Sequence, residues 1–200
     1  MSSEAKSESA VAAAERKGVR IRPGVAADET ALLALLPRLA EFALSPRRNS
    51  TDLWHSDAEL VVAHLAGDAP QCLLLVAEDT QSQPPQVAGL ALVSMQGEFM
   101  SHEPGSHLEA IAVAQGMEGR GVGRALLEAA ELGARERGAQ SMTLHVFNAN
   151  TRAHKLYEAI GFESEMQRCI KWFEPPVDAD QVGADEVGAD EVGADQIGAD

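Results

Sequence analysis

The chain has 200 residues, enough for one domain with a substantial core, and its 31 acidic residues outnumber its 16 basic ones. The formal charge of −15 disfavours contact with phosphate backbones, so we do not expect a nucleic acid partner. Two cysteines within apolar runs do not indicate a disulfide framework, and no stretch resembles a secretory leader or a membrane span of ~20 apolar residues, which favours a cytoplasmic protein without membrane attachment.

The two ends of the chain differ in composition from its middle. Residues 1–18 are rich in Ser, Ala, Glu and Lys without a sustained apolar period, and a five-residue unit containing Gly-Ala-Asp recurs within 174–200. Such segments cannot offset their ordering entropy, so both are predicted to be disordered. The tail holds nine acids and no base, which leaves 22 acids against 16 bases elsewhere. The domain predicted at 19–173 is therefore mildly acidic, which weakly favours cationic small molecules.

Hydrophobic periodicity and turn residues divide this domain into ten elements. In chain order they are a strand at 19–23, a helix from Asp28, a helix at 56–67, strands at 72–77, 87–95 and 108–113, a helix at 122–137, a strand at 142–147, a helix at 151–160 and a strand at 168–173. Pro37 predicts a kink or an early stop in the first helix, and Ser56 and Glu59 form a capping box for the second. The polar loop at Pro84-Pro85 predicts an antiparallel hairpin. This order indicates one α/β or α+β domain with a mixed sheet.

The segment after the strand at 108–113 has the features of an anion site. Three glycines alternate where the next helix begins: Gly119, Gly121 and Gly123. Glycines let backbone amides point at phosphate oxygens, and the helix dipole adds positive potential. A plain tight turn is the weaker interpretation. A Walker loop is excluded because Gly123 is not followed by Lys-Ser/Thr, and a dinucleotide fingerprint fails because Leu126 or Arg124 stands where it needs Gly or Ala.

The loop resembles the Arg/Gln-x-x-Gly-x-Gly/Ala motif of the GCN5-related N-acetyltransferase (GNAT) superfamily, with Gly121 and Gly123 at the two glycine positions. A second family signature follows downstream as Asn150-x-x-Ala153-x-x-Leu156-Tyr157-x-x-x-Gly161-Phe162. The resemblance covers roughly residues 19–173. It implies a GNAT-type single domain with a central mixed sheet of six to seven strands, about four flanking helices, and acetyl-CoA as co-substrate.

The resemblance also implies which residues contact acetyl-CoA. In the family, backbone amides of the fourth strand hold the pantetheine and thioester, and the glycine loop cradles the diphosphate. The corresponding positions are Ile111, Ala112, Val113, Gly119, Arg120, Gly121, Val122, Gly123, Arg124 and Asn150. Glu118 departs from the family, in which Arg or Gln stands at this position. We therefore expect affinity for the diphosphate to rest on the loop amides, Arg120 and Arg124.

Two side chains are implied as catalytic. Tyr157 matches the family's general acid, and a half-buried packing tyrosine is the alternative. Glu109 is the candidate base, acting directly or through water, because Leu-Glu-Ala-Ile-Ala-Val resembles the strand of diamine and aminoglycoside acetyltransferases. An exposed or salt-bridged carboxylate is the alternative. Alternation places Glu109 on one strand face with Ile111 and Val113 unless a bulge intervenes.

The histidines are scattered, and no pair has convincing metal-ligand spacing with a third donor, so we expect no metal. His107 and His145 are reserve bases, for which a structural role is the alternative. Residues of the expected acceptor walls are Phe42, Arg47, Arg48, Trp54, Phe99, Met100 and His102.

The resulting prediction is an N-acetyltransferase that moves the acetyl group of acetyl-CoA directly to a primary amine in a ternary complex. The acceptor is expected to be a small cationic amine or a lysine or N-terminal amine of a peptide. Two alternatives remain: a catalytically inactive acyl-CoA-binding regulatory protein, and an interaction protein that works through its acidic tail. A homodimer is also open, since sheet edges often pair in this family.

Overall fold

The computed structural model describes residues 11–15 and 17–173. The chain divides into two compact units, 1–163 and 164–200. Of the segments predicted to be disordered, 1–10 and 174–200 lie outside the described residues. Residues 11–15 are helical, and Ala14 is buried in the core, so this part of the N-terminal segment is ordered. The short run of Val and Ala at 11–14 supplies enough apolar surface to pack.

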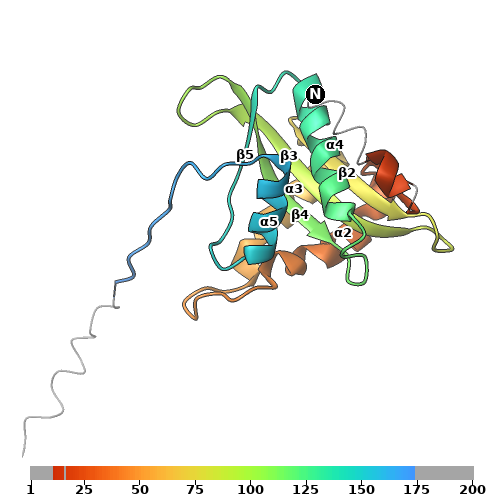
Figure 1. Cartoon of the computed structure of the whole chain (residues 1–200), viewed down its shortest axis with the longest axis horizontal. Helices are drawn as coiled ribbons and strands as arrows, with labels where there is room; N and C mark the ends of the chain where they lie inside the picture. The colour runs from red at the N-terminus through yellow and green to blue at the C-terminus, as the bar shows by residue number, and fades with distance from the viewer. Residues whose placement is uncertain (1–10, 16, 174–200) are drawn as a thin grey trace, which may run out of the picture. The chain divides into compact units, whose positions relative to one another are not determined.

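The first unit contains a five-stranded mixed sheet (Figure 1). Along the chain, helices separate β1 from β2 and β4 from β5. Its elements are β1 (Val19–Pro23), η1 (Ala26–Asp28), α2 (Glu29–Leu35), η2 (Leu36–Ala40), η3 (Thr51–Leu53), α3 (His55–Ala66), β2 (Cys72–Asp79), β3 (Gln86–Gly97), β4 (Pro104–Val113), α4 (Val122–Glu136), β5 (Ser141–Leu144) and α5 (Thr151–Ile160). The strands follow the order β1-β2-β3-β4-β5, antiparallel except for the parallel pair β4 and β5. The predicted mixed α/β class is confirmed.

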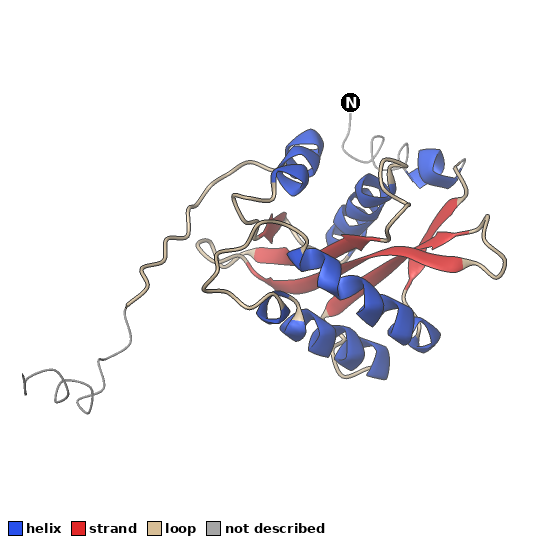
Figure 2. Cartoon of the chain, turned by 90° about the horizontal axis from the view of Figure 1, so that it is seen from below, coloured by secondary structure: helices blue, strands red, loops and turns tan. Residues whose placement is uncertain are grey.

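Helices lie on both faces of the sheet (Figure 2). On one face α4 packs through residues such as Leu126 and Leu127 against Leu75 and Ala77 of β2. On the other face α2 and α3 cover the alternate side chains of the same strand, together with those of β3. The strands therefore bury both faces, which explains why they appear in the sequence as nearly continuous apolar runs.

Helix ends follow the expected local signals in several places. Pro37 predicted an early stop, and α2 indeed ends at Leu35 and continues as the 3-10 helix η2. Gly161, the C-cap of α5, has a φ of 100°, and Gly138, which follows the C-cap Arg137 of α4, has a φ of 91°. None of the helices in the described ranges has the length and apolarity needed to cross a membrane.

Two predictions about secondary structure are wrong. The strand expected at 168–173 is not formed. The described part of the second unit, 164–173, has no regular secondary structure, and its side chains are exposed. The sheet therefore has five strands rather than six to seven. A strand requires hydrogen-bonded neighbours, which a local alternating pattern cannot supply. The capping box is also absent: α3 begins at His55, and its N-cap residue Trp54 makes no side-chain cap.

Candidate active site

The strands β4 and β5 separate beside the glycine loop. Their parallel pairing covers only four positions and ends where Leu108 meets Leu144. The remaining segment of β4, 110–113, stays paired with β3 on its other side. In the part of the chain that the structure describes, its β5-facing edge consequently has no strand partner. This edge includes Ile111 and Val113, and it leads directly to the loop that opens α4.

Glu109 lies in a β-bulge. The register between β3 and β4 shifts there, since Leu92 pairs with Ala110 and Val93 with Leu108. Leu108 accordingly packs in the α4-facing cluster, whereas Ala110 packs in the cluster under α2 and α3. The simple alternation that placed Glu109 on one face with Ile111 and Val113 is therefore broken at Glu109 itself.

The glycine loop has the backbone geometry of an anion cradle. Gly119 and Gly121 adopt φ angles of +72° and +86°, which side-chain-bearing residues rarely adopt, and no atom lies within 4 Å of a Cβ placed on either. Gly123 has an ordinary φ, but a Cβ there would lie 3.3 Å from Leu156 of α5. Its lack of a side chain thus lets α5 pack closely. The helix α4 begins at Val122 without a side-chain cap, so its first amides have no intrahelical acceptor.

The charged residues around the loop are paired in a way that the sequence did not indicate. Arg120 donates to the Lys17 carbonyl (2.9 Å) and to Gln81 Oε1 (3.2 Å), so its guanidinium is held near the β2–β3 turn. Arg124 Nε donates to Glu128 Oε1 at 2.7 Å, one turn further along α4. Both arginines of the predicted cofactor set therefore have partners within the protein.

Glu118 instead attracts two arginines from outside the loop. Its Oε1 accepts hydrogen bonds from Arg38 Nη2 of η2 and, at 3.2 Å, from Arg152 Nη1 of α5. The hydrogen bond from Arg152 and the charges of both arginines lower the pKa of Glu118, so it stays ionised at neutral pH. Neither arginine stands at a fixed position of a family motif, which is why the sequence did not identify them.

Helix α5 carries the two polar residues of the second signature. Asn150 is the N-cap, and its Oδ1 accepts from the Ala153 amide at 3.1 Å. Tyr157 is 9% exposed, and its ring meets Phe162 at a centroid distance of 5.7 Å. Burial raises the pKa of Tyr157 to about 12, so its phenol remains protonated over the physiological pH range. No hydrogen bond to the phenol oxygen is found among the described residues.

Titratable side chains gather around the start of the separated strand segment. The rings of His107 and His145 lie 4.7 Å apart, and the charge of Glu109 acts on both His107 and Asp57 of α3. Burial, followed by the negative charge of Glu109, raises the pKa of Asp57 to about 6. The sequence analysis missed Asp57, because its position inside the expected capping box suggested only a helix start.

The Thr143 hydroxyl positions the ring of His107. It lies 2.8 Å from His107 Nδ1 and 3.3 Å from the Ser106 carbonyl, so it links the ring to the backbone of the same strand. Burial, the largest cause, lowers the pKa of His107, which favours its neutral form at pH 7.

Aromatic contacts join the segment after η2 to the segment after β5. The rings of Phe42 and Phe147 lie 5.3 Å apart, and the Arg48 guanidinium lies 5.5 Å from the Phe147 centroid. Phe42 and Arg48 were expected in an acceptor wall, whereas Phe147 was not identified. Phe99 and Met100 are exposed at 77% and 55% in the β3–β4 turn.

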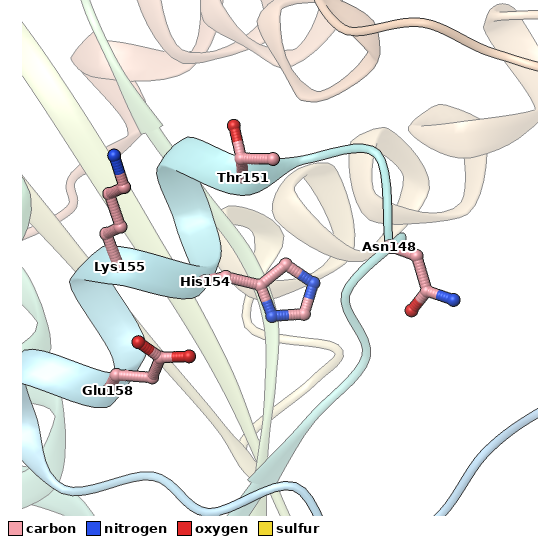
Figure 3. Close-up of a pocket in the computed structure, with 5 residues that line it drawn as sticks. All are labelled: Asn148, Thr151, His154, Lys155 and Glu158. Carbon is pink, nitrogen blue, oxygen red and sulfur yellow. The ribbon is translucent and has the colours of Figure 1, made fainter.

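A shallow hollow lies along one side of α5 (Figure 3). Its lining residues share one helix face or the loop before it: Asn148, Thr151, His154, Lys155 and Glu158. His154 and Asn148 point into the same open space (Figure 3). None of the predicted catalytic or cofactor residues lines this hollow.

Comparison with known proteins gives one family match. The model of the Acetyltransferase (GNAT) family matches residues 36–162, which include the β4 strand, the glycine loop and α5. A curated relative, the mycothiol acetyltransferase of Propionibacterium freudenreichii subsp. shermanii, is 42% identical over 59 residues. The matched segment spans 30% of this chain and only 19% of that protein.

Solved structures share the fold over most of the chain. A putative acetyl transferase from Pyrococcus furiosus is 22% identical, with a TM-score of 0.62 over 78% of this chain and 99% of that one. The enzyme AAC(6')-Iy, in complex with the bisubstrate analogue CoA-S-monomethyl-acetylneamine, is also 22% identical, with a TM-score of 0.56 over 78% of this chain and 98% of that one. At these identities the likeness establishes the fold alone.

Proposed function

Because the chain belongs to the Acetyltransferase (GNAT) family, we propose that it transfers the acetyl group of acetyl-CoA to a primary amine. The observation that carries this proposal is the continuity of three features: the unpartnered edge of β4, the glycine loop, and the uncapped start of α4. A strand edge can hydrogen-bond an extended pantetheine arm, and the amides at Val122–Arg124 suit its diphosphate. The residues present thus fit the cofactor that the family uses.

The cofactor contacts follow from this geometry. We assign the pantetheine and thioester to the backbone of Ile111–Val113, and the diphosphate to the loop Gly119–Arg124. Asn150 caps α5 through its oxygen, which leaves its amide nitrogen for a contact with the cofactor. An amide of the β4 edge also stabilises the negative charge that develops on the thioester oxygen.

The reaction needs a base for the amine and an acid for the leaving group. The amine nitrogen forms a bond to the thioester carbonyl carbon, the C–S bond breaks, and the amine proton passes to Glu109 directly or through water. Tyr157 donates its proton to the departing thiolate, and its raised pKa keeps that proton available. Burial lowers the pKa of His107 and favours its neutral form, which makes this residue the alternative base.

The acceptor proposal is a cationic amine, either a small molecule or a lysine or N-terminal amine. Asp57 and Glu109 are two carboxylates close enough for the charge of one to raise the pKa of the other. No hydrogen bond or ion pair with either carboxylate is found among the described residues. A protonated amine that binds between them would relieve their repulsion, and the base would then deprotonate it for attack.

A panel of amines, assayed by release of free CoA, tests the proposed activity. We expect turnover with one or more cationic amines and 1:1 binding of CoA by calorimetry. Absence of CoA binding would refute the whole proposal. CoA binding without turnover of any amine would instead favour the inactive acyl-CoA-binding alternative. Deletion of residues 175–200 tests the remaining alternative, an interaction protein that works through its acidic tail. If the protein is an enzyme, the deletion should leave its turnover unchanged.

A further inference from the structure

The cluster formed by Arg38, Glu41, Glu118 and Arg152, here called the Glu118 cluster, places two guanidinium groups at the glycine loop. Glu118 precedes Gly119 directly, and one of its oxygens serves both arginines. Arg38 also lies 3.2 Å from Glu41 through its second terminal nitrogen. Two cations and two anions make the cluster neutral overall, so the arginines add little net positive potential while these pairs persist.

Arg152 differs from the two arginines inside the loop in its freedom to reach a ligand. Arg120 donates to the Lys17 carbonyl and to Gln81 on the β2–β3 turn. Arg124 is bound to Glu128 one turn further from the helix start. Arg152, in contrast, is 68% exposed, and its one partner among the described residues is Glu118 itself. A ligand needs to displace only that carboxylate to gain the Arg152 guanidinium.

We propose that Glu118 is an internal counterion that competes with the diphosphate of the cofactor for Arg38 and Arg152. These arginines, rather than Arg120 and Arg124, supply the side-chain charge that binds the diphosphate. This inference rests on the proposed function, because it requires that the loop bind an acyl-CoA. It also explains how the loop accommodates an acid at a position where the family has Arg or Gln.

The opposite role for Glu118, holding the arginines in place for the ligand, is the weaker reading of the same contacts. The ion pair of Glu118 with the exposed Arg152 contributes little, since solvent screens it and ordering two long side chains costs entropy. A full negative charge beside a diphosphate, however, repels it over the whole range of a Debye length. Removal of the Glu118 charge should therefore strengthen diphosphate binding by more than the lost positioning of Arg38 and Arg152 weakens it.

The test measures CoA affinity by calorimetry in full-length variants. We expect Glu118→Gln to tighten CoA binding roughly threefold to tenfold, and Arg152→Gln to weaken it by a similar factor. Arg38→Gln should also weaken binding, with Arg38→Lys as a charge-preserving second variant because Arg38 is only 18% exposed. Pantetheine lacks the diphosphate, so its affinity should be the same in all variants.

The matched control is the surface pair Glu131 and Arg135 at the far end of α4, whose charged atoms lie 2.8 Å apart. Glu131→Gln and Arg135→Gln change charge in the same way and should leave CoA affinity unaltered. Opposite shifts for Glu118→Gln and Arg152→Gln support competition, because a purely structural ion pair would move both in the same direction. Weaker or unchanged CoA binding by Glu118→Gln overturns the inference. Wild-type protein that binds no CoA refutes the proposed function instead.

Discussion

Asp57 offers a stability measurement that tests the electrostatics of the candidate site without any ligand. Burial raises its pKa from 3.8 to about 6, and the charge of Glu109 adds to that effect. Since the folded-state pKa is the higher one, the unfolded chain loses this proton first as the pH rises. The free energy of unfolding therefore decreases between about pH 4 and pH 6 and stays lowered at higher pH.

The size of the effect follows from the shift. About two pKa units correspond to at most roughly 3 kcal/mol, and solvent that still reaches the carboxylate reduces this to about 1–2 kcal/mol. Asp57→Asn removes the charge, so the free energy of unfolding should rise by about 1–2 kcal/mol at pH 8 and change little at pH 4. Urea denaturation of both proteins at the two pH values measures this difference.

Two further variants isolate the cause. Asp68→Asn removes an acid from an exposed site just after α3, and it should produce no comparable gain at pH 8. Glu109→Gln removes the like charge, so the gain from Asp57→Asn should be smaller in that background. This prediction is refuted if Asp57→Asn raises the free energy of unfolding equally at pH 4 and pH 8, or lowers it at pH 8. Either result would show that the ionised Asp57 carboxylate does not destabilise the fold.

Three other outcomes are expected. Tyr157→Phe should lower kcat about 10²- to 10⁴-fold while the Kd for CoA stays constant, and unchanged kcat would remove Tyr157 as the acid. Gly121→Ala forces a side chain into a φ of +86°, so it should cost about 1–2 kcal/mol in a denaturant titration and weaken CoA binding, whereas Gly121→Asn should cost less. The kcat/KM for a cationic amine should decline as the pH falls through about 6, because Asp57 becomes protonated, and a profile that Asp57→Asn leaves unaltered would exclude it from acceptor binding.

Much of the fold could be predicted because its signals are local. Apolar periodicity and Gly161 gave the limits of α5, and the alternating glycines located the start of α4. Buried strands appeared as apolar runs flanked by turn residues, so β2 and β3 were found within a few residues of their ends. The strand expected at 168–173 failed for the complementary reason, since pairing depends on a neighbour that the segment itself does not encode.

The residues of the candidate site could be predicted only where they stand at fixed positions of a family motif. Tyr157 and the loop glycines stand at motif positions. Asp57 and Arg38 reach the site from elements without a motif, and Arg152 stands at a variable position of the second signature. Their contribution depends on how α3, η2 and α5 pack, which no local pattern fixes. The partners of Arg120 could not be predicted for the same reason, because Gln81 lies 39 residues from Arg120 in the sequence. The pair of Arg124 with Glu128, in contrast, has the local i,i+4 spacing of a helix.

The bulge at Glu109 also constrains how this strand can evolve. The bulged residue reverses the parity of β4, so Leu108 and Ala110 face different helices although they are two residues apart. Deletion of one residue there would exchange the faces of every side chain on one side of the deletion. Substitution of Glu109 keeps this parity, whereas the gain or loss of a single residue in β4 would exchange its side chains between the core under α4 and the core under α2 and α3.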